Sequence, residues 1–164
     1  MHIFTINEKT EEKFLKKKTA SVDLAALKHA ETRQLIQAMK TTMRQADGIG
    51  LSANQVGINM KLFVAQIMSE QTSKNKFYVI INPEIIKTSQ ETSRIEEGCL
   101  SVPKTFGMVE RPEKITITGL DRRGKKIRIK AWGMLARVFQ HEIDHLNGHL
   151  FIEKAAELHE VNRK

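Results

Sequence analysis

Residues 140–148 read QHEIDHLNG, with two histidines four positions apart and a glutamate directly after the first. On a helix, residues i and i+4 lie on the same face, so His141 and His145 can bind one metal ion. Glu142 lies roughly 100° further round the helix, from where its carboxylate can reach water at that ion. The pattern is typical of metallohydrolases. Two exposed histidines on a charged helix would give the same five residues.

The residues on either side of the motif predict a helix over 133–147 that ends at Gly148. Its apolar residues recur at helical spacing and are Leu135, Val138, Phe139 and Leu146. An earlier helix is predicted from Asp23 to about Asp47, because apolar residues recur there without Gly or Pro until Gly48.

Strands are predicted between these helices. Residues 61–65 and 77–81 are apolar and β-branched, with a polar loop over 69–76 between them. The second strand is expected to end at the Asn82-Pro83 dipeptide.

Alternating residues at 115–118 and 126–129, on either side of a polar turn at 121–124, predict a hairpin. Helices at both ends of a series of strands predict an α+β domain. The last residues, 153–164, are predicted to be a short helix or a frayed tail.

Composition predicts a single globular domain over residues 1–164, with 40% hydrophobic and 28% charged residues. No apolar run approaches the roughly 18–20 residues of a membrane span, and no signal peptide is evident, so we expect no membrane partner and a cytoplasmic location. The net charge of +8 indicates either a well-solvated basic surface or attraction to an RNA-rich assembly.

A metal ion on the two histidines needs a third protein ligand, and its identity separates the classes of enzyme. One class of zinc protease places a histidine ten residues after the first, but Phe151 stands there. Another class takes a glutamate from a later helix, and the acids available here lie in the short C-terminal segment. They are Glu153, Glu157 and Glu160.

Cys99 is the remaining candidate and the single cysteine of the chain, so it cannot form an internal disulfide. Its surroundings, EEGCLSVP, predict a tight exposed loop. A lone cysteine is more often an inert small hydrophobe. One Cys with two His is nevertheless a recognised catalytic ligand set that leaves a fourth position open to water.

Three motifs in a fixed order resemble the peptide deformylase family, whose members remove the formyl group from N-formylmethionine on new bacterial polypeptides. They are GIGLSANQ at 48–55, EGCLS at 97–101 and QHEIDH at 140–145. The resemblance extends from the helix before Gly48 to about Phe151. It implies an α+β fold in which mixed or antiparallel sheets pack around a central helix carrying the histidine motif.

The resemblance also implies roles for the motif residues. Cys99, His141 and His145 would bind one divalent ion, natively ferrous iron, with zinc, nickel or cobalt as substitutes. Glu142 would act as general base and then as general acid.

The oxyanion of the reaction would be held by the side-chain amide of Gln55 and the backbone N–H of Leu100. Glu97 would pair with Arg111 to fix the loop, although a surface ion pair would contribute little. The residues predicted to line the methionine pocket, with ordinary core packing as the alternative, are Ile49, Gly50, Ile95, Met134 and Val138.

The chain departs from the family pattern at three positions. Ser52 and Asn54 replace residues that are usually Ala and often Pro, and both are small enough to keep the turn. Phe106 stands where many members carry an Arg that contacts the peptide backbone of the substrate, which changes the expected peptide preference.

Together these observations predict a cytoplasmic, monomeric amidohydrolase acting on formyl-methionyl nascent chains, with transient ribosome association as a hypothesis from net charge. The alternatives are a metallopeptidase, a basic RNA-binding protein with a structural zinc, and an inactive or re-specialised homologue. Structural zinc sites normally use four protein ligands, which disfavours the second of these.

Overall fold

The computed structural model describes residues 1–164 except 24, 26–29, 69–74 and 162–164. Its helices are α1 (Lys9–Leu15), α2 (Ala30–Gln45) and α3 (Gly133–Leu146), with the 3-10 helices η2 (Ala53–Val56) and η3 (Phe151–Glu153). Its strands are β1 (Gly50–Ser52), β2 (Leu62–Met68), β3 (Asn75–Thr88), β4 (Thr92–Cys99), β5 (Val102–Pro112), β6 (Lys114–Leu120), β7 (Lys126–Trp132) and β8 (Ala156–Glu160).

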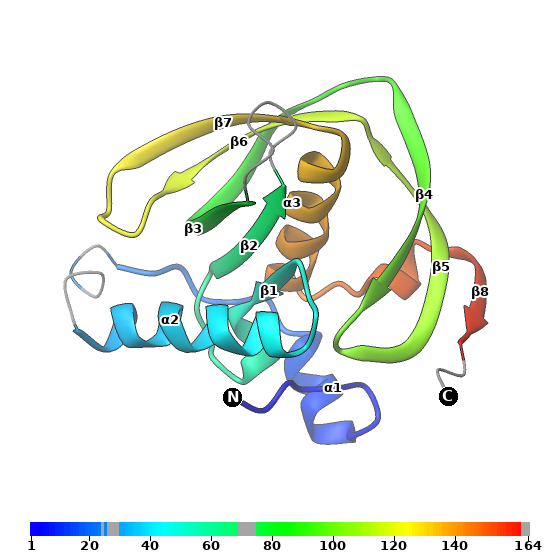
Figure 1. The fold of residues 1–164 in the computed structure, drawn as a ribbon, viewed down its shortest axis with the longest axis horizontal. Helices are drawn as coiled ribbons and strands as arrows, with labels where there is room; N and C mark the ends of the chain where they lie inside the picture. The colour runs from blue at the N-terminus through cyan, green and yellow to red at the C-terminus, as the bar shows by residue number, and fades with distance from the viewer. Residues whose placement is uncertain (24, 26–29, 69–74, 162–164) are drawn as a thin grey trace.

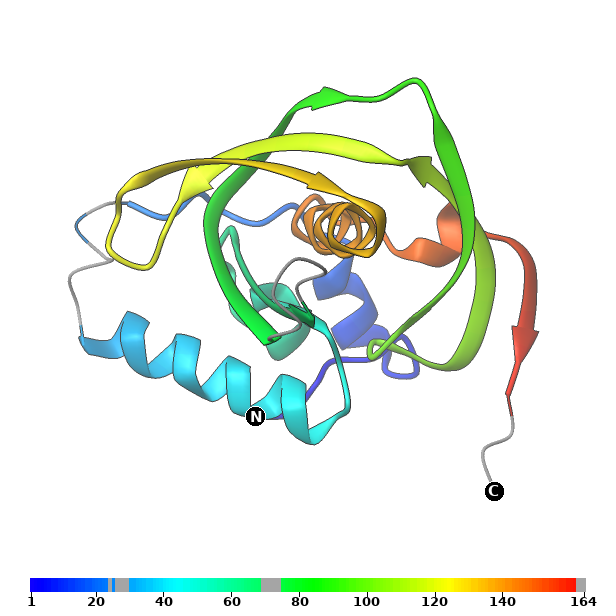
Figure 2. The same cartoon turned by 45° about the horizontal axis from the view of Figure 1, so that its top comes forward.

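The strands form two antiparallel sheets, in the orders β1-β2-β3-β6-β7 and β4-β5-β8. Helix α3 lies between them, and α2 covers the opposite side of the β1–β2 region (Figure 1). Figure 2 looks nearly along α3 and shows the strands curving round it. The predicted α+β fold with antiparallel sheets around a central helix is therefore confirmed.

The first four residues of strand β2 are buried, and their side chains point alternately to the two faces of the sheet. Leu62 and Val64 pack toward α2, whereas Phe63 and Ala65 pack toward α3. The ring of Phe63 lies 5.4 Å from that of Phe139 on α3. The central sheet thus fixes α3 by apolar packing, which gives the motif on this helix a rigid support.

Helix α3 ends as predicted, because Asn147 is its C-cap and Gly148 follows in the left-handed region at φ 82°. A Cβ at Gly148 would also meet the backbone carbonyl of Lys16. The predicted strand at 61–65 and the predicted hairpin correspond to β2 and the β6–β7 pair. No described helix is long and apolar enough to cross a membrane.

Two predicted boundaries are wrong. The early helix does not start at Asp23, whose side chain instead accepts a hydrogen bond from the Ala25 N–H in a turn; the described helix begins at Ala30. Most of the predicted loop at 69–76 lies outside the described residues.

Strand β3 does not end at Asn82 but continues through a register shift at which Asn82 has φ 50°. Such a bulge tolerates the missing N–H of Pro83.

The C-terminal segment is neither a helix nor a frayed tail over Ala156–Glu160, which forms strand β8 on the edge of β5. His159 lies opposite Phe106 in this pairing. An unpaired strand edge offers backbone donors and acceptors to any extended segment, so the pairing needs no apolar periodicity in that segment. This explains why the local sequence gave no sign of it.

Candidate metal and catalytic site

Cys99 and the two motif histidines meet in space although Cys99 and His141 lie 42 positions apart in the chain. Their ligand atoms all lie within 4.8 Å of one another. The Cys99 Sγ atom is 3.1 Å from His145 Nε2, which is 3.2 Å from His141 Nε2. Cys99 ends strand β4, and successive turns of α3 carry the histidines.

These separations fit a single metal ion. Tetrahedral zinc, with bonds of about 2.0 Å to nitrogen and 2.3 Å to sulfur, needs its ligand atoms roughly 3.3–3.6 Å apart. The two distances from His145 Nε2, 3.1 Å to Cys99 Sγ and 3.2 Å to His141 Nε2, agree with these values to within a few tenths of an ångström. Among the described residues this is the only group of three that could hold an ion, and three ligands leave a fourth coordination position open.

Cys99 is partly buried at the β4–β5 turn, which corrects the expectation of an exposed loop. Burial alone would raise the pKa of its thiol. Electrostatic attraction to His145 and hydrogen bonds with both histidines instead bring that pKa well below its usual value. The site therefore favours the thiolate, which is the form that binds metals.

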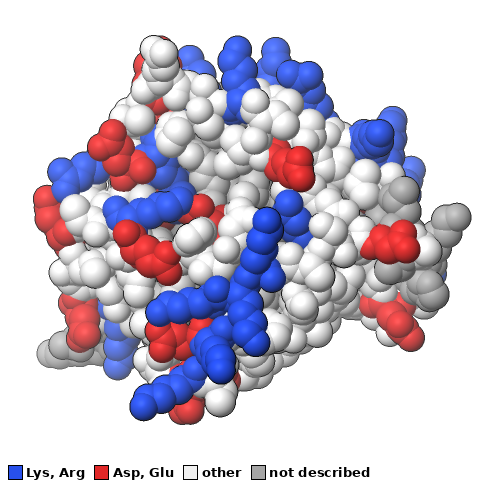
Figure 3. Space-filling model, turned by 180° about the vertical axis from the view of Figure 1, so that it is seen from behind, with Lys and Arg blue, Asp and Glu red and all other residues white. Residues whose placement is uncertain are grey.

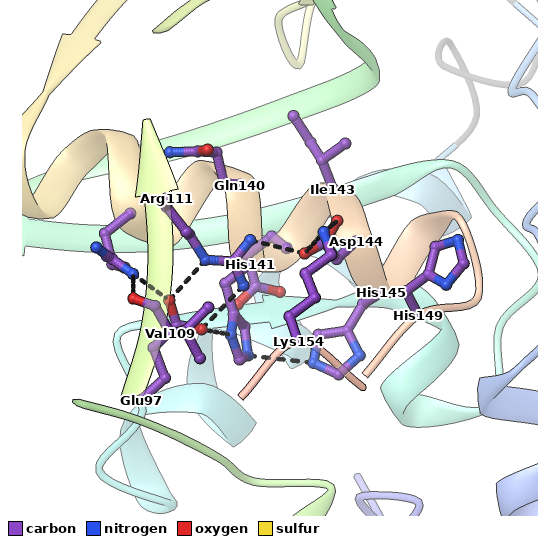
Figure 4. A network of polar contacts seen from close by, with 12 residues as sticks. Glu97, Val109, Arg111, Gln140, His141, Ile143, Asp144, His145, His149 and Lys154 are labelled. Atoms are coloured by element: carbon purple, nitrogen blue, oxygen red, sulfur yellow. Dashed lines mark hydrogen bonds and ion pairs between the residues drawn. The ribbon is translucent and has the colours of Figure 1, made fainter. Parts of the chain in front are cut away.

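His141 is oriented by a buried glutamate (Figure 4). Its Nδ1 lies 3.0 Å from Glu97 Oε2, so Nε2 is turned toward Cys99 and His145. A carboxylate on the far nitrogen of a ligating imidazole fixes the ring and raises its basicity. Burial alone would lower the pKa of His141, but its hydrogen bonds with Cys99 and Glu97 raise it to about 10.

Glu97 is itself held by two arginines. Arg111 binds both of its carboxylate oxygens, at 2.6 and 2.9 Å, and Arg137 Nη1 binds Oε1 at 2.9 Å. Burial alone would raise the pKa of Glu97, but the hydrogen bonds from Arg111 and His141 bring it well below its usual range. Glu97 and Arg111 are only 6% and 3% exposed, so the predicted pair is not a weak surface contact.

Arg137 and Asp144 belong to this network and were not among the predicted site residues. Arg137 also donates to the carbonyl oxygens of Val109 and Ser93, and thereby joins α3 to both β4 and β5. Asp144 accepts from Arg111 at 2.7 Å. Arg137 lies one helical turn before His141, a spacing that could have placed it on the same face of the helix.

Glu142 lies beside the ligand group and is only 3% exposed. Burial raises the pKa of its carboxyl group, against the lowering effect of the two motif histidines. Ser52 Oγ donates to Glu142 Oε2 at 2.7 Å. A Cβ at Gly50 would collide with the same carboxylate, so glycine is needed there for close approach.

Gln55 contacts the ligand group through its side-chain amide, and Leu100 directly follows Cys99 in the chain. Gln55 Oε1 accepts from the Ser52 N–H at 2.8 Å, which turns Nε2 toward Cys99 Sγ at 3.5 Å and Ser101 Oγ at 3.1 Å. Asn54 is buried as well and donates to the carbonyl oxygen of His145 at 2.6 Å. The motif at 48–55 is thus anchored directly on α3.

A cavity of about 500 Å³ opens in front of the ligand group. Cys99, His141, Glu142, Gln55 and Leu100 all line it. All five residues predicted for the methionine pocket also line it, namely Ile49, Gly50, Ile95, Met134 and Val138. Ile49 and Met134 are 49% and 44% exposed, which contradicts ordinary core packing for these two.

Phe106 lines the same cavity, and its ring stacks on His159 of β8 at 6.2 Å between centroids.

The glutamates that a protease of the second class would need as a third metal ligand lie elsewhere. Glu153 binds His149 and Glu157 binds Arg94, and neither is in the ligand group.

Comparison with known proteins agrees with this geometry. The polypeptide deformylase family model matches residues 2–161. The chain belongs to the peptide deformylase family. A peptide deformylase of Halothermothrix orenii is 49% identical over 130 residues, which cover 79% of this chain and 81% of that protein. One from Rhizobium meliloti is 46% identical over 129 residues, covering 79% and 74%.

The fold agrees as well. A Met-Ala-Ser-bound crystal structure of a class I type b peptide deformylase from Acinetobacter baumannii superposes with a TM-score of 0.83 at 35% identity, covering 93% of this chain and 96% of that one. The deformylase family is metal-dependent, and the chain is a hydrolase that removes N-formyl groups from nascent peptides.

Proposed function

We propose that Cys99, His141 and His145 hold one divalent ion, ferrous iron in the cell, with zinc, nickel or cobalt able to replace it. The converging ligand atoms and the depressed pKa of the Cys99 thiol support this assignment. When bound, such an ion supplies Lewis acidity that makes water nucleophilic near neutral pH. The chain's own residues then direct that water and move its protons.

Glu142 is proposed as the proton carrier. It accepts a proton from the attacking water and delivers it to the amine nitrogen, which must leave protonated. Burial raises the pKa of this carboxyl group, which suits a group that must first accept and then release a proton. Its position on the cavity wall, next to His141 in sequence, supports the role.

Gln55 and Leu100 are proposed as the oxyanion donors. Negative charge develops on the formyl oxygen during attack, and donors already aimed at that point stabilise the transition state more than the ground state. Gln55 Nε2 faces Cys99 Sγ and has its amide orientation fixed by the Ser52 N–H. An amide supplies this hydrogen bond without adding a competing charge.

The substrate is proposed to be an N-formylmethionyl peptide whose methionine side chain contacts Ile49, Gly50, Ile95, Met134 and Val138. The relative from Acinetobacter baumannii that was crystallised with Met-Ala-Ser supports a peptide of this kind. Phe106 gives the cavity an apolar wall, so we expect a weaker demand for contacts with the peptide backbone there.

We further propose that residues 1–164 act as one cytoplasmic, monomeric domain that meets its substrate at the ribosome. Lys and Arg side chains project along the upper edge of the molecule in Figure 3. On strand β7, Lys126, Arg128 and Lys130 alternate on the exposed side, and no ion pair found among the described residues involves them. Binding to purified ribosomes should weaken steeply with added salt, and salt-independent binding would contradict this proposal.

The observation that carries the proposed function is the meeting of Cys99 with the histidine pair beside Glu142. Formate release from formyl-Met-Ala-Ser should be measured anaerobically on the iron-loaded enzyme. Acetyl-Met-Ala-Ser and unblocked Met-Ala-Ser serve as control peptides. Rapid release from the formyl peptide alone is expected, whereas cleavage of the internal peptide bonds would indicate a metallopeptidase.

A further inference from the structure

Ser52 makes a contact with the proposed proton carrier that the motif resemblance does not explain. Its side chain is fully buried, and its Oγ lies 2.7 Å from Glu142 Oε2 and 3.0 Å from the carbonyl oxygen of the same residue. A hydroxyl carries one proton, and the shorter of the two contacts, to the carboxylate oxygen, is the stronger. Ser52 is therefore a donor to the carboxylate rather than a passive filler of the turn.

Strand β1 holds the two carboxylate oxygens differently. Gly50 and Ser52 are two residues apart, so both face α3, while Leu51 between them packs toward α2. Ser52 binds Oε2, and Oε1 lies against Gly50, where a Cβ would strike it. Both Gly50 and Glu142 line the cavity. The strand therefore ties down one oxygen and leaves the other beside the space where a substrate enters.

We propose that Ser52 is a positioning residue that fixes the rotation of the Glu142 carboxylate, so that Oε1 remains the oxygen that exchanges protons. This inference rests on the role of Glu142 in the proposed function. The terminal torsion of a glutamate is intrinsically broad, so without a donor on Oε2 the carboxylate would sample rotations in which neither oxygen faces the reacting atoms. A misaligned proton carrier slows the chemical step rather than substrate binding.

The test compares variants that differ in the hydroxyl alone. Ser52→Ala removes it and introduces the residue usual at this position of the motif, so the fold should accept the change. Ser52→Thr and Ser52→Val form a second pair with equal shape. In each comparison we expect kcat to fall roughly tenfold when the hydroxyl is absent, with KM within about twofold and metal content unchanged.

Thr19, which lies outside the helices, offers a matched control because it also bonds to α3. Its buried Oγ1 donates to the carbonyl oxygen of Leu146 at 2.9 Å, away from Glu142. Thr19→Val removes a comparable bond to α3 and should lower stability without lowering kcat. An equal fall in kcat for Thr19→Val and Ser52→Ala would overturn the inference, because it would indicate a general loosening of the helix.

A readout besides turnover is the orientation of the Glu142 side chain in crystals of the metal-loaded variants. One carboxylate rotamer is expected for the wild type and Ser52→Thr, and two or more for Ser52→Ala. Suppose that the wild type releases formate and Glu142→Gln does not. An unchanged kcat in Ser52→Ala would then refute the role of Ser52 and leave the proposed function standing. A wild type that releases no formate would instead refute the proposed function.

Discussion

Two buried glutamates flank His141, and their surroundings shift their pKa values in opposite directions. Glu97 receives hydrogen bonds from Arg111, Arg137 and His141, and its pKa falls well below the usual range. Among the described residues, Glu142 accepts one side-chain hydrogen bond, from the Ser52 hydroxyl, and none from an arginine, and burial raises its pKa. Both side chains are less than a tenth exposed, so burial acts to raise the pKa of both, and the hydrogen bonds from Arg111 and His141 reverse this effect for Glu97.

The difference separates a permanent charge from a movable proton. A carboxylate held by two guanidinium groups stays ionised and can orient His141 at all working pH values. A carboxylate in a poorly solvated site with a single neutral donor can take up and release a proton. One site thus uses two glutamates for two different tasks. Four measurements can test whether the groups that contact each glutamate cause this difference.

The largest effect is expected for Glu142→Gln. The amide keeps the shape of the side chain but cannot carry the proton, so kcat should fall by roughly 10²–10⁴. Metal content, measured by elemental analysis, should equal that of the wild type. Stability should be unchanged or higher, because the folded state penalises the charged form of Glu142. Near-normal turnover would remove Glu142 from the proposed mechanism.

Glu97→Gln should instead act mainly on stability and metal binding. It leaves the charges of Arg111 and Arg137 buried without their carboxylate, and breaking such a pair costs about 3–5 kcal/mol. Metal affinity, measured by chelator competition, should fall roughly 10–100-fold because His141 loses its orienting partner. The turnover of fully loaded sites should change far less than in Glu142→Gln; equal losses in the two variants would erase the proposed distinction.

The pH dependence of stability should identify Glu97 as the ionised member of the two. Its pKa is depressed in the folded state, so its contribution is fully present above the unfolded-state pKa of about 4.3 and is lost as the pH falls toward the folded-state value. In urea titrations, the gap between the wild type and Glu97→Gln should therefore be constant near neutral pH and shrink below about pH 4. A gap that persists unchanged at pH 3 would argue against an ionised Glu97.

The smallest effect is expected at an exposed ion pair whose N–O distance is similar to that of Glu97 and Arg111. Arg94 and Glu157 lie 2.7 Å apart, but their side chains are 49% and 70% exposed. Water and salt screen such a pair, so Glu157→Gln should shift the melting temperature by no more than about 2 °C. A shift as large as that of Glu97→Gln would show that separation, and not burial, sets the strength of these ion pairs.

Sequence reasoning predicted the parts of the site that local periodicity or a motif defines. The helix over 133–147 and the hairpin were placed correctly, and the five residues predicted for the methionine pocket line a single cavity. The start of α2, the continuation of β3 past Asn82 and the strand at Ala156–Glu160 were not. The strand at Ala156–Glu160 and the extension of β3 depend on the distant strands β5 and β6 as partners, which no window of neighbouring residues contains. The start of α2 was missed because the Asp23 side chain accepts a hydrogen bond from the Ala25 N–H and holds a turn there.

By itself, the sequence determined that two histidines and a glutamate share one helix, and that a lone cysteine lies far from them in the chain. Only the tertiary structure decided that the sulfur meets the imidazoles, that two arginines converge on Glu97, and that Ser52 reaches Glu142. Helical spacing is a property of adjacent residues. The pKa of a buried carboxyl group depends on which charges and donors the fold brings within hydrogen-bonding distance, and those come from strands and loops separated by tens of residues.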